Sequence, residues 1–442
     1  MPDGYYMSSV YGDNFIGWHV NRGEDLTPDF YRAVQFDRIL YRPDVVSGAF
    51  QSAGMGGTRS LASTLNADFQ IAKLREIAPP RLRLTTLSVD SADSGKPQLK
   101  LKVEGEKSAL GIRDYSVFVN GIPVTPSRER HLAGRDAEHF SRTVQIDLSA
   151  HDNEIRVEAF NGVSMGIAET YVPLPGKVSP AQVSGDLYML AVGANAFPGL
   201  PKRMHLSFAA QDADEIGKAL QLHGLGNYKQ VHVNTLSDVS AEKPDRATIL
   251  SALQFAEQAG PNDTVVIFLA SHGISDQSGN YYFVPRDVQL QDIAMAQKGE
   301  EVKSLISWTA FFDALRGVAG RRVLIVDTCH AKNIEGSFEA HSLLKRSASS
   351  QFALIVAAKG NEESQEYSKA KHGLFTYSLL SAMNADSDKN HDGVLSLQEI
   401  FDAALPLVDS LRFKQAGPQT PQMVAPQVLS EMPVMKAQVA TP

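Results

Sequence analysis

The sequence predicts an α/β domain, with a mostly parallel sheet and helices on both faces, preceded by an antiparallel β-sandwich. Two patterns support this fold class. From about residue 80 to 175, apolar and polar residues alternate with the period of half-buried antiparallel strands. From about 185 to 412, continuous apolar runs are separated by helical stretches, which is typical of a parallel sheet buried on both sides. At 442 residues, the chain has room for roughly two to three domains.

The first pattern contains several short segments of alternating character. The pair Asn120-Gly121, after one of these segments, is a strong signal for a tight turn. Strands that recur in this way, with Gly, Pro and Asp-Asn between them, favour a sandwich of immunoglobulin-like type over 80–175. The predicted strands are 82–84, 99–103, 115–119, 144–148 and 155–159.

The second pattern opens with an apolar run at 187–193 and a helical stretch at 209–220. In a sheet of this kind, the loops at the carboxyl ends of the strands form the crevice where ligands bind. We therefore expect functional side chains directly after the apolar runs. Further strands are predicted at 230–234, 264–270, 322–327 and 352–358, with helices at 246–258, 308–315, 374–383 and 397–411.

The remaining segments carry weaker signals. Residues 1–46 contain two short β-prone runs, 3–9 and 15–20, separated by a Gly-Asp turn, and predict a hairpin region. A lone hairpin is barely stable in water, so this region must pack on something else. Residues 47–79, rich in Ser, Gly and Ala, are predicted to be a linker with a short helix near 65–77, and 413–442 a C-terminal tail.

Composition limits the classes of function that are open to this protein. A formal net charge of −8 and a pI near 5.9 argue against binding to nucleic acid. The longest apolar runs are strand-length, so no membrane partner is expected. The single cysteine cannot form an intrachain disulfide, and the first residues show no secretory signal. We therefore expect a cytoplasmic protein.

The single cysteine also carries the main functional signal. Cys329 ends one apolar run and His272 ends another, so two predicted strands each deliver one member of a thiol and imidazole pair. An imidazole that takes the thiol proton makes cysteine a usable nucleophile. The amide of Gly273, with that of Cys329, would hold a developing oxyanion. A buried apolar cysteine and a structural histidine are the alternatives, and one thiol without clustered ligands makes a poor zinc site.

Ser271-His272-Gly273 after one apolar strand, and Asp327-Thr328-Cys329-His330-Ala331 after the next, resemble the catalytic strands of the caspase-like cysteine peptidases, especially bacterial orthocaspases and metacaspases. The histidine precedes the cysteine by 57 residues (272 to 329), as in that family. The resemblance continues through 187–197, 211–213, 282–287 and 372–376. It implies a caspase-like fold and a cysteine endopeptidase that needs no cofactor for its chemistry.

The same resemblance implies substrate preference. The metacaspase pattern places one aspartate two residues before the nucleophile and another in the first helix region, and takes Lys or Arg; Asp327 and Asp212 occupy the matching positions. Their carboxylates would pair with a basic side chain of a protein or peptide substrate. The alternatives are a strand-end turn acid for Asp327 and a first-turn helix acid for Asp212.

Lys345 and Arg346, in a polar segment, predict a self-cleavage site or a solvated basic patch.

A separate motif indicates calcium. Residues 388–399 fit the pattern D-x-N-x-D-G-x5-E at every defined position. Such a loop surrounds a hard cation with oxygen ligands, although Asp-Asn-Gly runs also form ordinary turns. Calcium would stabilise the domain here, and the calcium site known among metacaspases is a different one. The predicted ligands are the side chains of Asp388, Asn390, Asp392 and Glu399 and the carbonyl of Val394.

Residues 1–46 resemble the end of a WD-type propeller of the kind found ahead of bacterial caspase-like domains, with about one blade present. Either the chain is a truncated relative or the hairpin docks elsewhere. Two functions therefore stay open: a cysteine endopeptidase, or a non-enzymatic adaptor whose sandwich and caspase-like fold bind protein partners. The presence of both His272 and Cys329 favours the peptidase.

Overall fold

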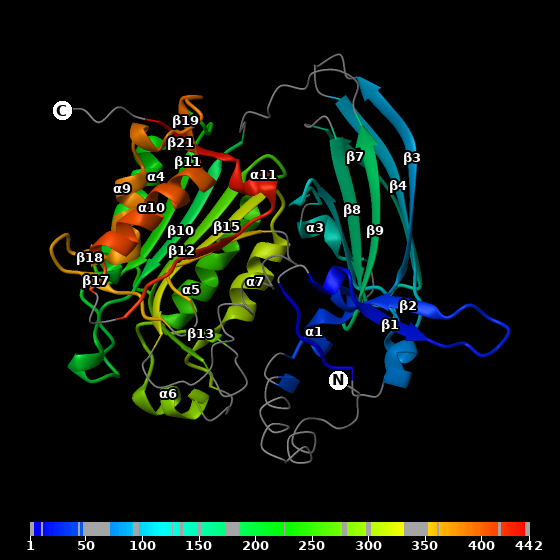
Figure 1. Ribbon diagram of the computed structural model, residues 1–442, viewed down its shortest axis with the longest axis horizontal. Coiled ribbons are helices and arrows are strands. Elements are labelled where there is room, and N and C mark those ends of the chain that lie inside the picture. The colour runs from blue at the N-terminus through cyan, green and yellow to red at the C-terminus, as the bar shows by residue number, and fades with distance from the viewer. Residues whose placement is uncertain are drawn as a thin grey trace. The chain divides into compact units, whose positions relative to one another are not determined.

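The computed structural model divides the chain into two compact units, Met1–Ala181 and Gln182–Pro442 (Figure 1). Each unit has its own sheets and buried core. The residues described by the structure are 4–9, 12–42, 45–46, 71–91, 97–125, 127–132, 136–148, 152–173, 185–224, 226–275, 281–297, 302–330, 352–359, 362–413 and 417–437.

The first unit contains two antiparallel sheets, of strand order β3-β4-β7 and β6-β5-β8-β9. All five strands predicted in this region are present. Asn120 and Gly121, at φ +50° and +80°, form the expected tight turn between β5 and β6. The bounds are β3 Arg81–Ser91, β4 Pro97–Glu106, β5 Asp114–Val119, β6 Ile122–Pro123, α3 Ser127–Arg130, β7 His139–Asp147, β8 Asp152–Phe160 and β9 Met165–Pro173.

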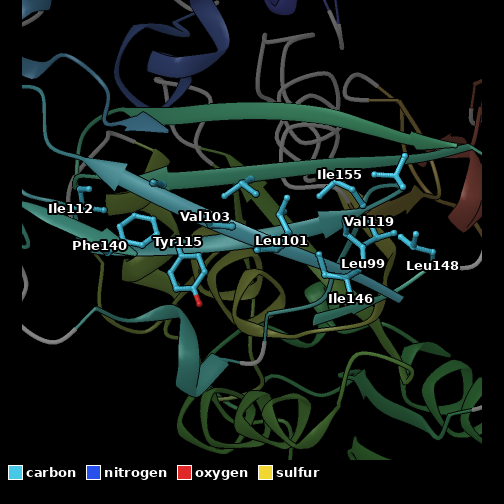
Figure 2. Close-up of a cluster of buried hydrophobic side chains, with 14 of the residues drawn as sticks. Leu99, Leu101, Val103, Ile112, Tyr115, Val119, Phe140, Ile146, Leu148 and Ile155 are labelled. Atoms are coloured by element: carbon cyan, nitrogen blue, oxygen red, sulfur yellow. The ribbon is translucent and has the colours of Figure 1, made fainter. Parts of the chain in front are cut away.

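The two sheets share one apolar core, to which alternate residues contribute. Leu99, Leu101 and Val103 of β4 are fully buried and cluster with Val119 of β5 and Ile155 of β8 (Figure 2). The predicted antiparallel two-sheet unit is therefore present, while its immunoglobulin-like character stays a prediction. The sequence missed β9 because several of its residues are partly or fully exposed, which weakens the alternation.

The N-terminal region pairs differently from the prediction. Strand β1 (Gly17–Val20) pairs with β2 (Asp29–Arg32), whereas residues 4–9 make only a single bridge, Tyr6 to Tyr41. The hairpin expected between 3–9 and 15–20 was thus wrong, because Tyr6 packs into an aromatic cluster with Trp18 and Tyr41. The other elements here are η1 Gly12–Asn14, η2 Ala33–Phe36, α1 Asp37–Leu40 and η3 Ile71–Ile77.

This region docks on the sandwich. Gln35 donates a hydrogen bond to the Met165 carbonyl (3.2 Å), and the Arg38 guanidinium lies 4.3 Å from the centre of the Phe160 ring. The hairpin therefore has the packing partner that its small size requires. Its likeness to a propeller blade stays a prediction. Of the predicted linker helix, 71–77 is a 3-10 helix, and 47–70 lie outside the described residues.

The second unit contains a mixed sheet of order β11-β10-β12-β15-β16-β20, parallel throughout except for its last pair. This confirms the mostly parallel α/β fold. Short strands β13 and β14 continue the sheet beside the end of β12. The bounds are β10 Leu187–Gly193, β11 Val231–Ser237, β12 Thr264–Ser275, β13 Tyr281–Phe283, β14 Ile306–Ser307, β15 Arg321–His330, β16 Ala353–Val356 and β20 Gln422–Val424.

Helices cover both faces of this sheet (Figure 1). Ile216 of α4, Leu379 of α9 and Phe401 of α10 line one apolar cavity with Val266 of β12 and Ile325 of β15, so these helices share a face. Helices α5 and α7 cover the other face (Figure 1). The bounds are α4 Ala209–His223, α5 Arg246–Ala252, η5 Leu253–Gln258, α6 Leu290–Gln297, α7 Trp308–Gly317, α9 Leu374–Ala382 and α10 Leu397–Leu411.

The predicted C-terminal tail belongs to this domain instead. Strand β20 pairs with β16, and β21 (Pro433–Lys436) pairs with β19 (Val394–Ser396). Met432 and Met435 are buried, so tertiary contacts order a segment whose own sequence has no clear period. In the parts of the chain that the structure describes, every helix is too short or too polar to cross a membrane.

Candidate active site

The backbone brings the two predicted catalytic positions together. Strands β12 and β15 pair in parallel without a break from Thr264↔Arg321 to Gly273↔His330. In this register, His272 pairs with Cys329. Because neighbouring strands lie about 4.8 Å apart, the two residues share one level at the carboxyl ends of adjacent strands.

His272 is held in an orientation suited to proton transfer. Its Nε2 lies 2.6 Å from the Met204 carbonyl oxygen. A carbonyl can only accept, so Nε2 carries the hydrogen of this contact, and Nδ1 of the neutral ring is left to accept a proton. The ring also packs on Phe197, with centroids 5.2 Å apart. Burial lowers the pKa of His272, which favours the neutral, basic form.

Sequence reasoning missed Met204, because the contributing atom is a backbone carbonyl and its side chain carries no signal. Met204 ends the 3-10 helix η4 (Lys202–Met204), in the connection between β10 and α4. The fold brings this carbonyl across 68 residues of sequence to the imidazole. Its role is to fix the tautomer and direction of the ring.

Gly273 lies beside a buried tyrosine. A Cβ atom at Gly273 would approach the Tyr281 hydroxyl oxygen to 1.5 Å, so only glycine fits here. The Tyr281 hydroxyl makes a hydrogen bond with the Thr328 hydroxyl, next to Cys329 in sequence. Tyr281 thus braces the two strands at the level of the candidate dyad. The oxyanion role of the Gly273 amide stays a prediction.

Asp327 is a buried carboxylate with a full set of neutral donors. The Ser364 hydroxyl donates to Oδ1 (2.6 Å), and the Thr376 amide and hydroxyl donate to Oδ2 (3.2 and 2.6 Å). Burial raises the pKa of Asp327, and these hydrogen bonds oppose that shift. Asp327 therefore ties the start of α9 to the end of β15.

Asp212, in the first turn of α4, is 2% exposed. Its Oδ1 lies 2.7 Å from His372 Nδ1, and its Oδ2 accepts from the Gly373 amide at 2.9 Å. Burial raises the pKa of Asp212 to about 7; the charge of Asp327 also raises it, and the hydrogen bonds from His372 and Gly373 oppose the shift. The acid is therefore poised to change its charge near neutral pH.

The structure places the two acids side by side. A Cβ atom built on Gly373 would lie 2.9 Å from Asp327 Oδ2 and 3.0 Å from Asp212 Oδ2. Both carboxylates therefore lie against Gly373, where a side chain larger than that of glycine would clash with them. Sequence reasoning identified both acids but not the residues that hold them. The polar residues of 372–376, noted only as a helix start, were the available signal.

The predicted calcium loop lies between η6 (Ala385–Ser387) and α10. Asp388 accepts hydrogen bonds from the amides of Asp392 and Gly393, and Glu399 accepts from the amides of Lys389 and Asn390. Glu399 also caps α10 through Ser396. Among the residues described, no group of three or more His, Cys, Asp or Glu side chains has a metal-holding arrangement. Oxygen donors of the type that calcium prefers are present, and calcium binding stays a prediction.

The self-cleavage residues, Lys345 and Arg346, lie in 331–351, outside the described residues. The position of Cys329 is described by its backbone pairing in β15.

Comparisons with known proteins agree with this geometry. The family model described as "Caspase domain", of the C14 peptidases, matches residues 188–432, more than half of the chain. No curated protein gives a significant match.

Among solved structures, protein YxiM of Bacillus subtilis is 11% identical, with 62% of this chain and 76% of that chain covered and a TM-score of 0.20. Bacteroides uniformis β-glucuronidase 2, bound covalently to cyclophellitol-6-carboxylate aziridine, is 9% identical, with 75% and 44% covered and a TM-score of 0.17. These two structural similarities are too weak to carry an argument.

The matched segment contains the mixed sheet, both strands of the candidate dyad and the paired acids. The chain therefore belongs to the caspase-domain family of cysteine peptidases.

Proposed function

We propose that the protein is an endopeptidase that cleaves after Arg or Lys, with Cys329 as the nucleophile and His272 as the base. The observation that carries this proposal is the pairing of His272 with Cys329 at the ends of β12 and β15. Val323 and Ile325 of β15 line the cavity under α4 and α9. Because alternate residues of a strand fall on the same face, Asp327 and position 329 belong to that face as well. His272 stands six residues after Val266 of that cavity, so both positions fall on one face.

The proposed reaction follows from these roles. His272 Nδ1 takes the thiol proton, and the thiolate attacks the carbonyl carbon of the scissile bond. The amides of Gly273 and Cys329 stabilise the oxyanion. The carbon–nitrogen bond then breaks, and the leaving amine receives the proton from the imidazolium. Water hydrolyses the thioester that remains and regenerates the thiol. The chemistry requires no metal or cofactor.

We assign the preference for a basic residue to Asp327 and Asp212. Both acids lie against Gly373, just before α9, and Asp327 is two residues along β15 from the proposed nucleophile. A guanidinium or ammonium group there would make charge-assisted hydrogen bonds with two carboxylates. In a buried site, such pairing is stronger than in water.

Peptide assays test this function. Fluorogenic peptides that differ only in the residue before the bond, Arg, Lys, Gln or Asp, are incubated with the protein in calcium and in chelator. We expect turnover of the Arg and Lys peptides at least about tenfold above that of the Gln peptide. Absence of turnover in every condition would favour the alternative, a non-enzymatic adaptor that binds protein partners.

A single reduced thiol as nucleophile is suited to a reducing compartment, so we propose a cytoplasmic location.

Self-cleavage after Lys345 or Arg346 follows from the same specificity. Mass spectrometry of purified protein is expected to show fragments ending at one of these residues. The Cys329→Ala protein, prepared in parallel, is expected to stay intact. Identical fragments from both proteins would exclude self-cleavage and point to a contaminating protease.

We further propose that calcium binds the 388–399 loop and stabilises the domain, which would modulate activity indirectly. Glu399 would turn from the amides of Lys389 and Asn390 toward the ion. Calorimetric titration with calcium is expected to give heat with the wild type and at least about tenfold weaker binding with Glu399→Gln. Glu431→Gln, at an exposed glutamate outside the loop, is the matched control. No heat from the wild type would remove the proposal.

A further inference from the structure

A short hairpin holds the start of α4 at two points. Strands β17 (Glu366–Tyr367) and β18 (His372–Gly373) pair antiparallel. Glu366 Oε1 accepts from the amides of Ser207 (2.6 Å) and Phe208 (3.1 Å), just before α4. His372 and Gly373, on the other strand, contact Asp212 in the first turn. The hairpin therefore fixes the position of the Asp212 side chain at the start of α4.

The two acids differ in the kind of partner they have. Asp327 is held by neutral donors from Ser364 and Thr376. Among the hydrogen-bond partners described for the two acids, His372 is the one that can carry a positive charge. It is also well covered, with 13% of its side chain exposed. A buried pair of carboxylates strongly resists carrying two charges, so the proton on or near Asp212 decides the charge of the cluster.

Two acids and an aromatic ring face Asp212 and His372 from neighbouring elements. Asp327 faces them from β15 and Glu366 from β17, and both are acids. From α9, Tyr377 lies against the His372 ring, with centroids 6.5 Å apart. Because acids face this cluster from two strands, it favours a basic side chain.

We propose that His372 is a positioning residue for specificity: its contact with Asp212 Oδ1, together with the Gly373 amide on Oδ2, holds the Asp212 carboxylate beside Asp327 in the charged form that a basic side chain needs. The proposal rests on the proposed specificity pocket and adds a residue to it. Without the imidazole, a basic side chain must displace a proton from a buried carboxyl group.

This role predicts a shift in pH dependence. In His372→Asn, the amide can still donate to Asp212, but it cannot carry a positive charge beside that carboxylate. Since burial raises the pKa of Asp212 to about 7, removal of the imidazole is expected to keep Asp212 protonated to higher pH. Affinity for a basic group should fall about five- to tenfold at pH 6.5 and recover by pH 8.5 to 9.

The test uses the full chain and two readouts. Binding of agmatine, a guanidinium amine that mimics an arginine side chain, is measured by calorimetry from pH 5.5 to 9. The ratio of kcat/KM for Arg and Gln peptides is measured at pH 6.5 and 8.5. His232→Asn is the matched control, because His232 forms another His–Asp contact, with Asp186 at 3.2 Å, on β11. Asp212→Asn is expected to flatten the pH profile.

The outcomes separate this inference from the peptidase itself. A pH midpoint of agmatine binding that is higher in His372→Asn than in the wild type, with the midpoint of His232→Asn unchanged, would support it. Equal midpoints in wild type and His372→Asn, equal losses with Arg and Gln peptides, or no agmatine binding by the wild type would overturn it. If agmatine binds with the expected pH shift but no peptide is cleaved, the pocket inference stands and the proposed peptidase function fails.

Discussion

Replacing Cys329 with alanine is expected to lower hydrolysis of arginyl peptides by about 10⁴-fold or more. The reason is that, in the proposed mechanism, the nucleophile and its base act as one unit. His272, with Nε2 fixed on the Met204 carbonyl, has only Nδ1 left to accept the thiol proton. Without the sulfur, no covalent intermediate forms. Steady-state kinetics with active-site titration of the wild type would measure the loss.

A double substitution tests the pairing directly. Because His272 acts through Cys329, the His272→Ala variant is expected to lose a similar factor, and the double variant to lose little more than either single variant. His139→Ala, at an exposed histidine of β7 in the first unit, is a suitable control for loss of a histidine. Retention of more than about one per cent of the wild-type rate in Cys329→Ala, beyond contaminating protease, would exclude the proposed nucleophile.

Two substitutions of Asp327 are expected to have different consequences. Asp327→Ala leaves the Ser364 hydroxyl and the Thr376 amide and hydroxyl without their buried acceptor, and should lower the free energy of unfolding by about 2–4 kcal/mol. Asp327→Asn keeps the shape and one acceptor oxygen. Since burial already raises the pKa of Asp327, removal of its charge should cost little stability.

The asparagine variant should instead lose specificity. Its kcat/KM for Arg and Lys peptides is expected to fall by about 10- to 100-fold, with a smaller change for the Gln peptide. Urea unfolding and kinetics on the same samples separate the two effects. Asp409→Asn, at an aspartate whose side chain is 78% exposed, serves as the control. An Asp327→Asn enzyme with unchanged preference for Arg over Gln would mean that Asp327 only organises the loop.

Much of the second unit could be predicted because its strands are buried on both faces. The continuous apolar runs before His272 and Cys329 are the buried parts of β12 and β15. β21 was missed for the opposite reason: its burial depends on distant neighbours such as β19, with which it pairs. The Tyr6 bridge to Tyr41, which replaced the expected N-terminal strand pair, likewise arose from side-chain packing that no local pattern encodes.

The sequence by itself determined the strands that carry His272 and Cys329 and the turn at Asn120-Gly121, because each depends on local burial or backbone preference. The two acids were named from the resemblance to metacaspases. Only the tertiary structure decided that His272 pairs in register with Cys329, that the Met204 carbonyl orients the imidazole, and that His372 shares a hydrogen bond with Asp212. These contacts join segments up to 160 residues apart, and their geometry follows from sheet register and helix packing. The hydrophobic pattern along the chain does not encode contacts between segments so far apart in sequence.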